Sequence, residues 1–137
     1  MASTVSVKEL KGVSDEIAEK LKAKGISNNL DYLEASKTPA DRKSLAADLG
    51  IELDLVLEIA NRADLSRLHG IAGVYSDLLE NAGVDTVKEL ARRNAENLFA
   101  KLAEVNTALQ LTTRPISQEL VSDIIEQAKS LPPTLEY

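Results

Sequence analysis

Apolar residues recur at helical spacing along the whole chain, and capping residues divide them into short segments. A small polar residue precedes most of the apolar stripes, and a glycine or proline follows several of them. In the first half, the predicted helices run from Ser14 to Gly25, around Leu30 and Leu33, from Pro39 to Gly50, and from Leu53 to just before Asp64. The pattern therefore predicts short helices joined by tight turns.

The second half of the chain follows the same plan. The predicted elements there are a turn of helix at Leu65 to Leu68, a helix through Leu78 and Leu79 that ends at Gly83, a short helix capped by Asp85, a helix capped by Asn94, a loop from Thr112 to Pro115, and a last helix from Ser117 to Pro132. Nowhere do β-branched residues alternate with polar ones over the length of a strand. The predicted fold class is all-α.

One stretch of sequence occurs twice. Leu10-Lys11-Gly12-Val13-Ser14 returns 58 positions later as Leu68-His69-Gly70-Ile71-Ala72, and the same offset separates Gly25 from Gly83. Each pair of glycines encloses apolar residues at helical spacing, which predicts one short helix between two glycine turns. The chain is therefore predicted to contain internal repeats at about residues 5–65 and 66–131, with a short tail at 132–137.

The two copies are expected to form one structure. The chain length suits a single globular domain over residues 1–137, and no Gly- or Ser-rich linker separates the halves. Each copy carries an apolar face that a neighbour must cover. We expect the copies to pack as a pseudo-symmetric pair around a shared core.

The repeated stretches are similar to a known structural motif. Leu10-x-Gly12-Val13-x-x-x-x-Ala18-x-x-Leu21 and its second copy resemble the helix-hairpin-helix motif, in which two helices flank a tight loop. Residues 64–70 and 82–94 look like a family of uncharacterised bacterial proteins, a domain of unknown function, built from duplicated units of this kind. The resemblance implies a SAM- or helix-hairpin-helix-like fold and no particular activity. It places the hairpin turns at Gly12, Val13, Gly70, Ile71 and Gly73.

The hairpins depart from those of DNA-binding relatives, in which backbone amides point at a phosphate. Ser14 and Ala72 replace the second loop glycine, so a positive φ there would be strained. Three carboxylates follow the first hairpin, whereas the second has Gly73 and fewer acidic neighbours. We therefore interpret both hairpins as structural turns, and the second as the better candidate for an anion.

Charge and composition disfavour several classes of partner. With 22 acidic and 16 basic residues the net charge is −6, which repels a phosphate backbone, and one Phe, three Tyr and no Trp leave few rings on which bases can stack. The absence of cysteine excludes disulfides and thiolate metal sites. No apolar run is long enough to cross a membrane, so a cytoplasmic protein without a membrane partner is expected.

Catalytic chemistry has no signature in the chain. The single histidine, His69, has no neighbouring nucleophile or ligand set, and no phosphate-binding loop or dinucleotide fingerprint is present. We therefore predict no enzyme activity, catalytic residue, metal, cofactor or small-molecule substrate.

Two functions stay open at this point. The first is a non-catalytic interaction or scaffold module that binds another protein or itself. The alternative is weak, sequence-independent binding of duplex DNA or RNA through the hairpin amides. The candidate anion contacts for this alternative are Arg62, Arg67, His69, Arg92 and Arg93.

Overall fold

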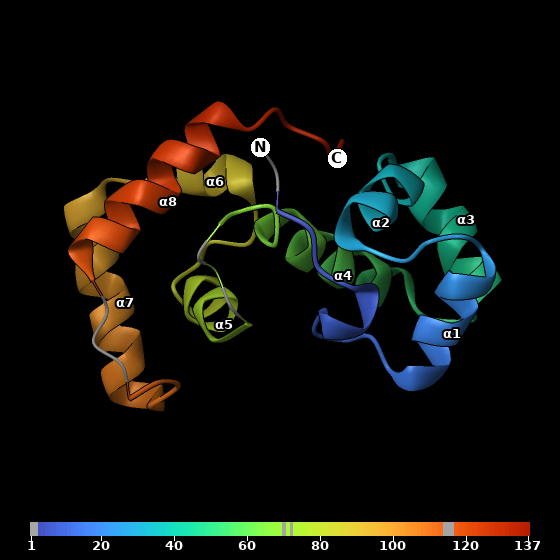
Figure 1. Ribbon diagram of the computed structural model, residues 1–137, viewed down its shortest axis with the longest axis horizontal. Helices are drawn as coiled ribbons and strands as arrows, with labels where there is room; N and C mark the ends of the chain where they lie inside the picture. Colours follow the sequence, from blue (N-terminus) through green and yellow to red (C-terminus); the bar gives the residue numbers. More distant parts are fainter. Residues whose placement is uncertain (1–2, 70, 72, 114–116) are drawn as a thin grey trace. The chain divides into compact units, whose positions relative to one another are not determined.

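The fold is all-α, as predicted. The structure is a computed structural model that describes residues 3–69, 71, 73–113 and 117–137. Eight α-helices and one short 3-10 helix cover most of these residues, which contain no strand beyond an isolated antiparallel bridge between Ser6 and Asn28 (Figure 1). None of the helices within the described part has the length and apolar character needed to span a bilayer.

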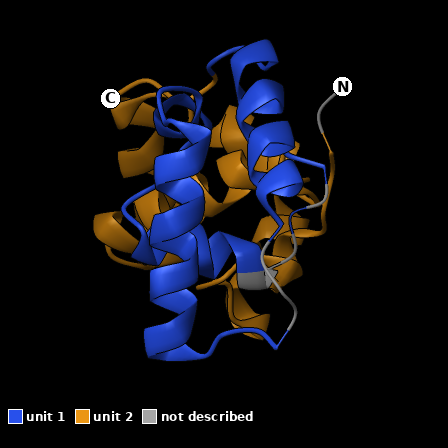
Figure 2. Cartoon of the chain, turned by 90° about the vertical axis from the view of Figure 1, so that its left-hand side faces the viewer, with its two compact units in different colours: residues 1–2, 68–133 blue, residues 3–67, 134–137 orange. Residues whose placement is uncertain are grey.

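Two compact units make up the chain. Unit 1 contains residues 68–133, and unit 2 contains residues 3–67 together with residues 134–137 (Figure 2). The boundary between residues 67 and 68 lies close to the predicted boundary between the repeats. Residues 134–137, predicted as part of a short tail, belong to unit 2.

Unit 2 consists of the 3-10 helix η1 and four α-helices. Their bounds are Val7–Glu9 for η1, Asp15–Ala23 for α1, Asn29–Ala35 for α2, Pro39–Leu49 for α3 and Leu53–Leu65 for α4. The predicted caps are present: the Ser14 hydroxyl accepts a hydrogen bond from the Ile17 amide at 3.2 Å, and Thr38 forms a capping box with Asp41 ahead of Pro39. These local bonds fix where α1 and α3 begin.

The core of unit 2 is aliphatic, apart from one ring. Its buried members are Val7, Leu10, Ile17, Leu21, Ile26, Tyr32, Leu33, Leu45, Ala46, Leu49, Val56, Ile59, Ala60 and Ala63. The Tyr32 hydroxyl donates a hydrogen bond to the Val56 carbonyl at 2.9 Å, which joins α2 to α4. The buried Asn29 side chain accepts from the Val5 amide and donates to the Ala63 carbonyl, so it ties the start of the chain to the same two helices.

Unit 1 has four α-helices. They are α5 (Gly73–Asn81), α6 (Val87–Ala91), α7 (Ala95–Leu109) and α8 (Gln118–Ser130). Asn94 and Ser117 cap α7 and α8 as predicted, but the prediction of Asp85 as the cap of α6 is wrong. Thr86 fills that role, because its hydroxyl accepts from the Glu89 amide at 3.2 Å. The predicted helical turn from Leu65 to Leu68 is not a separate helix, since α4 continues to Leu65.

Several local features recur 58 positions apart in the two units. Helix α1 and helix α5 each have nine residues, with bounds that differ by this offset. Both helices end in the same pair of backbone hydrogen bonds, from Gly25 to Lys22 and Ile26 to Leu21 in one, and from Gly83 to Glu80 and Val84 to Leu79 in the other. This pattern is a Schellman motif with glycine at positive φ, 81° for Gly25 and 90° for Gly83.

Candidate functional site

The first hairpin turn lies against helix α4. Gly12 has φ +95°, and a Cβ placed there would lie 3.1 Å from Leu55 Cδ1 and 3.3 Å from Ile59 Cγ1. Val13 is half-buried and packs against the core of unit 2. The turn therefore needs glycine both for its backbone conformation and for its close approach to α4.

The second hairpin is described only in part. Gly70 lies outside the described residues, Ile71 is half-buried, and Gly73 begins α5. The His69 amide donates to Gln127 Oε1 at 2.7 Å, and Gln127 Nε2 donates to the His69 carbonyl at 3.2 Å. One side chain of α8 thus binds both backbone groups of the residue before the turn.

The surroundings of His69 are acidic. His69 is exposed and lines a shallow concavity together with Asp123, Glu126 and Gln127 of α8. Carboxylates at this position repel an anion rather than attract one. Groups of three or more histidine or acidic side chains able to hold a metal ion do not occur in the described sequence.

Two of the predicted anion contacts are buried. Arg62 is 5% exposed and Arg67 is 3% exposed. The Arg67 guanidinium donates from both Nε and Nη2 to Asp64 Oδ1, at 3.0 and 2.7 Å. Neither guanidinium is therefore exposed on the surface where an anion could contact it.

The paired arginines after α6 have different environments. Arg93 is half-buried, and its guanidinium donates to the Gly83 carbonyl at 3.2 Å, so it supports the glycine turn after α5. Arg92 is exposed and lines a concavity of about 240 Å³ between α6 and α8. We call this concavity the α6–α8 groove. It is lined by Val87, Lys88, Ala91, Arg92, Ala128, Lys129, Leu131 and Pro133.

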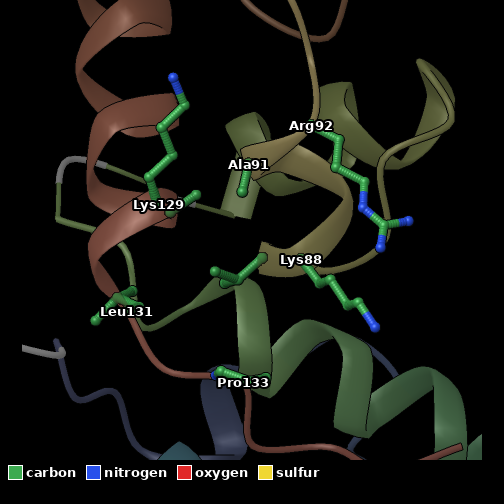
Figure 3. A pocket seen from close by; sticks show the side chains of 8 residues that line it. Lys88, Ala91, Arg92, Lys129, Leu131 and Pro133 are labelled. Atoms are coloured by element: carbon green, nitrogen blue, oxygen red, sulfur yellow. The ribbon is translucent and has the colours of Figure 1, made fainter.

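The α6–α8 groove combines aliphatic side chains with three cations. Lys88 extends from α6, Arg92 from the residue that caps the end of α6, and Lys129 from α8 (Figure 3). Lys129 lies 3.5 Å from Glu126, whereas no carboxylate of the described chain pairs with Lys88 or Arg92. Lys88 and Arg92 are four positions apart at the end of α6, a spacing at which two like charges repel each other, so an anion between them would be stabilising.

Sequence reasoning had singled out Arg92 but neither of the two lysines. The signal for Lys88 was available, because it precedes Arg92 by four positions on a predicted helix. No comparable signal marks Lys129, since its approach to α6 depends on how α8 packs in unit 1.

Among protein-family models, the one described as Domain of unknown function (DUF4332) matches residues 11–131. Neither the comparison with curated proteins nor the comparison with solved structures gives a match. The matched segment contains the second hairpin stretch, the first hairpin stretch from Lys11 onward, and all of the α6–α8 groove except Pro133. Because the match spans most of the chain, the protein belongs to the DUF4332 family.

Proposed function

We propose that the protein is a non-catalytic interaction module that binds a segment of another protein in the α6–α8 groove. The observation that carries this proposal is the arrangement of Lys88 and Arg92, two cations without a carboxylate partner in the described chain, beside an aliphatic floor. Such a surface complements a segment in which carboxylates flank an aliphatic side chain.

The chemistry of the groove favours a protein segment over a phosphate backbone. Five of its eight lining residues are apolar: Val87, Ala91, Ala128, Leu131 and Pro133. A phosphate backbone gains little from apolar surface, whereas an aliphatic side chain gains about 25 cal/mol for each Å² that it buries. The partner we propose is therefore acidic and aliphatic together.

A short fluorescent peptide with two leucines flanked by glutamates tests the proposal. We expect saturable binding that weakens as salt is added, because the contacts to the rim are electrostatic. The Lys88→Glu/Arg92→Glu variant should lower the affinity about tenfold or more, since each change replaces attraction by repulsion.

A matched control separates the groove from the total charge. The Lys43→Glu/Lys101→Glu variant changes the net charge by the same amount at exposed positions outside the groove. Equal loss of affinity in both variants, or equal binding of a peptide with glutamines in place of glutamates, would contradict the proposal. Dimers in sedimentation that disappear in the Lys88→Glu/Arg92→Glu variant would instead assign the groove to a second copy of the chain.

We also infer that the two units are helix-hairpin-helix-like copies of one ancestral segment. Support comes from the recurrence of nine-residue helices and identical Schellman bonds at an offset of 58 residues. Helices α4 and α8, the last helix of each unit, both have thirteen residues. The pseudo-symmetric packing of the copies is part of this inference.

The alternative function, binding of duplex nucleic acid through the second hairpin, has less support. It needs cations around that hairpin, but Arg62 and Arg67 are buried and carboxylates of α8 lie beside His69. The net charge of −6 opposes it further.

A further inference from the structure

Residues 134–137 occupy a specific site on unit 2. The Glu136 amide donates to the Lys37 carbonyl at 2.8 Å, and the Glu136 carbonyl accepts from Arg42 Nη2 at 2.7 Å. Both backbone groups of this residue are therefore bound, while the residue itself is exposed. Recognition of a main chain in this way tolerates many side chains at the central position.

The flanking side chains supply specificity. Leu135 packs against the core of unit 2. Arg42 Cζ lies 5.5 Å from the centre of the Tyr137 ring, and the Tyr137 hydroxyl donates to Asn61 Oδ1 at 2.9 Å. An aliphatic residue and a tyrosine two positions apart thus define what the site accepts.

Arg42 is built to hold a peptide carbonyl. It is only 5% exposed, and its guanidinium donates to the carbonyls of Ser36, Lys37 and Glu136, at 2.8, 3.0 and 2.7 Å. If residues 134–137 left, one strong donor would lose its acceptor in a place that water reaches poorly. The vacated site would therefore favour another peptide carbonyl.

We propose that unit 2 carries a binding site for a Leu-x-Tyr segment of a partner protein, and that residues 135–137 of the chain itself fill this site until the partner displaces them. We call the site the tail cradle; it comprises Lys37, Arg42, Asn61 and the apolar surface under Leu135. It shares no residue with the α6–α8 groove.

The geometry makes the bound segment exchangeable. Tyr137 is 67% exposed, so it can leave the cradle without unpacking a helix. The covalent link gives residues 135–137 a local concentration of about the millimolar order, which a partner must outcompete. The apparent affinity of a partner for the unaltered chain is therefore its intrinsic affinity multiplied by the fraction of cradles that are empty.

A fluorescein-labelled peptide with the sequence of residues 133–137 tests the proposal on the chain of residues 1–137. We expect it to bind saturably to the Leu135→Ala/Tyr137→Ala variant, in which the chain's own segment is weakened. Binding to the unaltered chain should be at least about tenfold weaker, because its own segment competes. A scrambled peptide should bind to neither protein.

A second pair of changes tests the contact itself. Replacing the peptide tyrosine by phenylalanine removes the hydrogen bond to Asn61 and should weaken binding about fivefold, but it should have no effect in a chain that also carries Asn61→Ala. The Lys88→Glu/Arg92→Glu variant should leave this peptide's affinity unchanged, which separates the tail cradle from the function proposed above. Absence of saturable binding to the folded Leu135→Ala/Tyr137→Ala variant, or equal binding of the scrambled peptide, would overturn the proposal.

Discussion

Buried arginines in unit 2 are stabilised in two different ways. Arg67 forms an ion pair with Asp64, in which both side chains are about 5% exposed or less. Arg42 donates instead to neutral backbone carbonyls. Arg67 donates twice to one carboxylate oxygen, whereas Arg42 donates to three neutral carbonyls, so single substitutions should affect the two arginines differently.

Removal of Asp64 should destabilise the fold strongly. Asp64→Ala removes a buried oxygen that accepts from both Nε and Nη2 of Arg67, and we expect a loss of about 3–5 kcal/mol in the free energy of unfolding. Urea denaturation followed by circular dichroism measures this loss. Asp48→Ala removes the exposed partner of Lys24, an ion pair of 2.8 Å, and should cost about 1 kcal/mol or less. Similar losses in the two variants would show that burial does not set the strength of the Asp64 pair.

Tyr32 should make the protein sensitive to alkali. Burial raises the pKa of the Tyr32 phenol well above its usual value. In the unfolded chain the phenol ionises near its ordinary pKa of about 10, whereas in the folded chain it stays protonated. Ionisation therefore does not lower the free energy of unfolding below about pH 10, but it lowers that free energy increasingly as the pH rises further. Tyr32→Phe should cost about 1 kcal/mol at neutral pH through loss of the bond to Val56.

The measurement is urea denaturation of both proteins at neutral pH and at about pH 11. We expect the unaltered chain to lose more stability between the two conditions than Tyr32→Phe does. Parallel losses in the two proteins would mean that other groups cause the alkaline sensitivity.

At the scale of single elements, local signals predicted most helix boundaries. Ser14, Thr38, Asn94 and Ser117 cap their helices as the sequence indicated, because a cap needs only its own amide neighbours. At α6 two neighbouring residues could both act as caps, and the sequence alone did not separate Asp85 from Thr86. Arg42 was missed because it lies on the same face of α3 as Leu45 and Leu49, where an apolar residue would be expected.

Two glycine turns of unit 2, those at Gly12 and Gly25, should differ in their tolerance of alanine. Gly25→Ala places a side chain at φ 81° with no heavy atom within 4 Å, so it should cost about 1 kcal/mol through backbone strain alone. Gly12→Ala adds contacts of 3.1 and 3.3 Å with α4 and should cost at least about 1 kcal/mol more. Urea denaturation of both variants checks the order. A larger loss for Gly25→Ala would show that the Gly12 turn does not depend on its packing against α4.

At the scale of the whole molecule, the sequence located the basic residues but not their exposure. Arg62 and Arg67 flank the second hairpin along the chain, yet both are buried. The α6–α8 groove gathers Lys88 and Lys129 from distant segments. Burial and long-range contacts arise from the packing of whole helices, and neither composition nor local spacing determines them.

The net charge should prevent nucleic acid binding. With a net charge of −6 and with Arg62 and Arg67 buried, we expect no binding of a labelled DNA duplex at micromolar protein, even in low salt. Fluorescence anisotropy at two salt concentrations makes the measurement. Binding that falls steeply with salt and that Lys88→Glu/Arg92→Glu abolishes would instead support a nucleic acid surface at the groove.

The burial of Arg67 should also protect the chain from proteolysis at this residue. Trypsin cleaves after arginine, but it needs an exposed side chain and an accessible stretch of backbone. Arg67 is buried with Leu65 and Leu68 on either side, and its carbonyl accepts from the Ser3 amide. The peptide bond after Arg67 is therefore a poor protease target in the folded protein, and cleavage at this bond would report local unfolding.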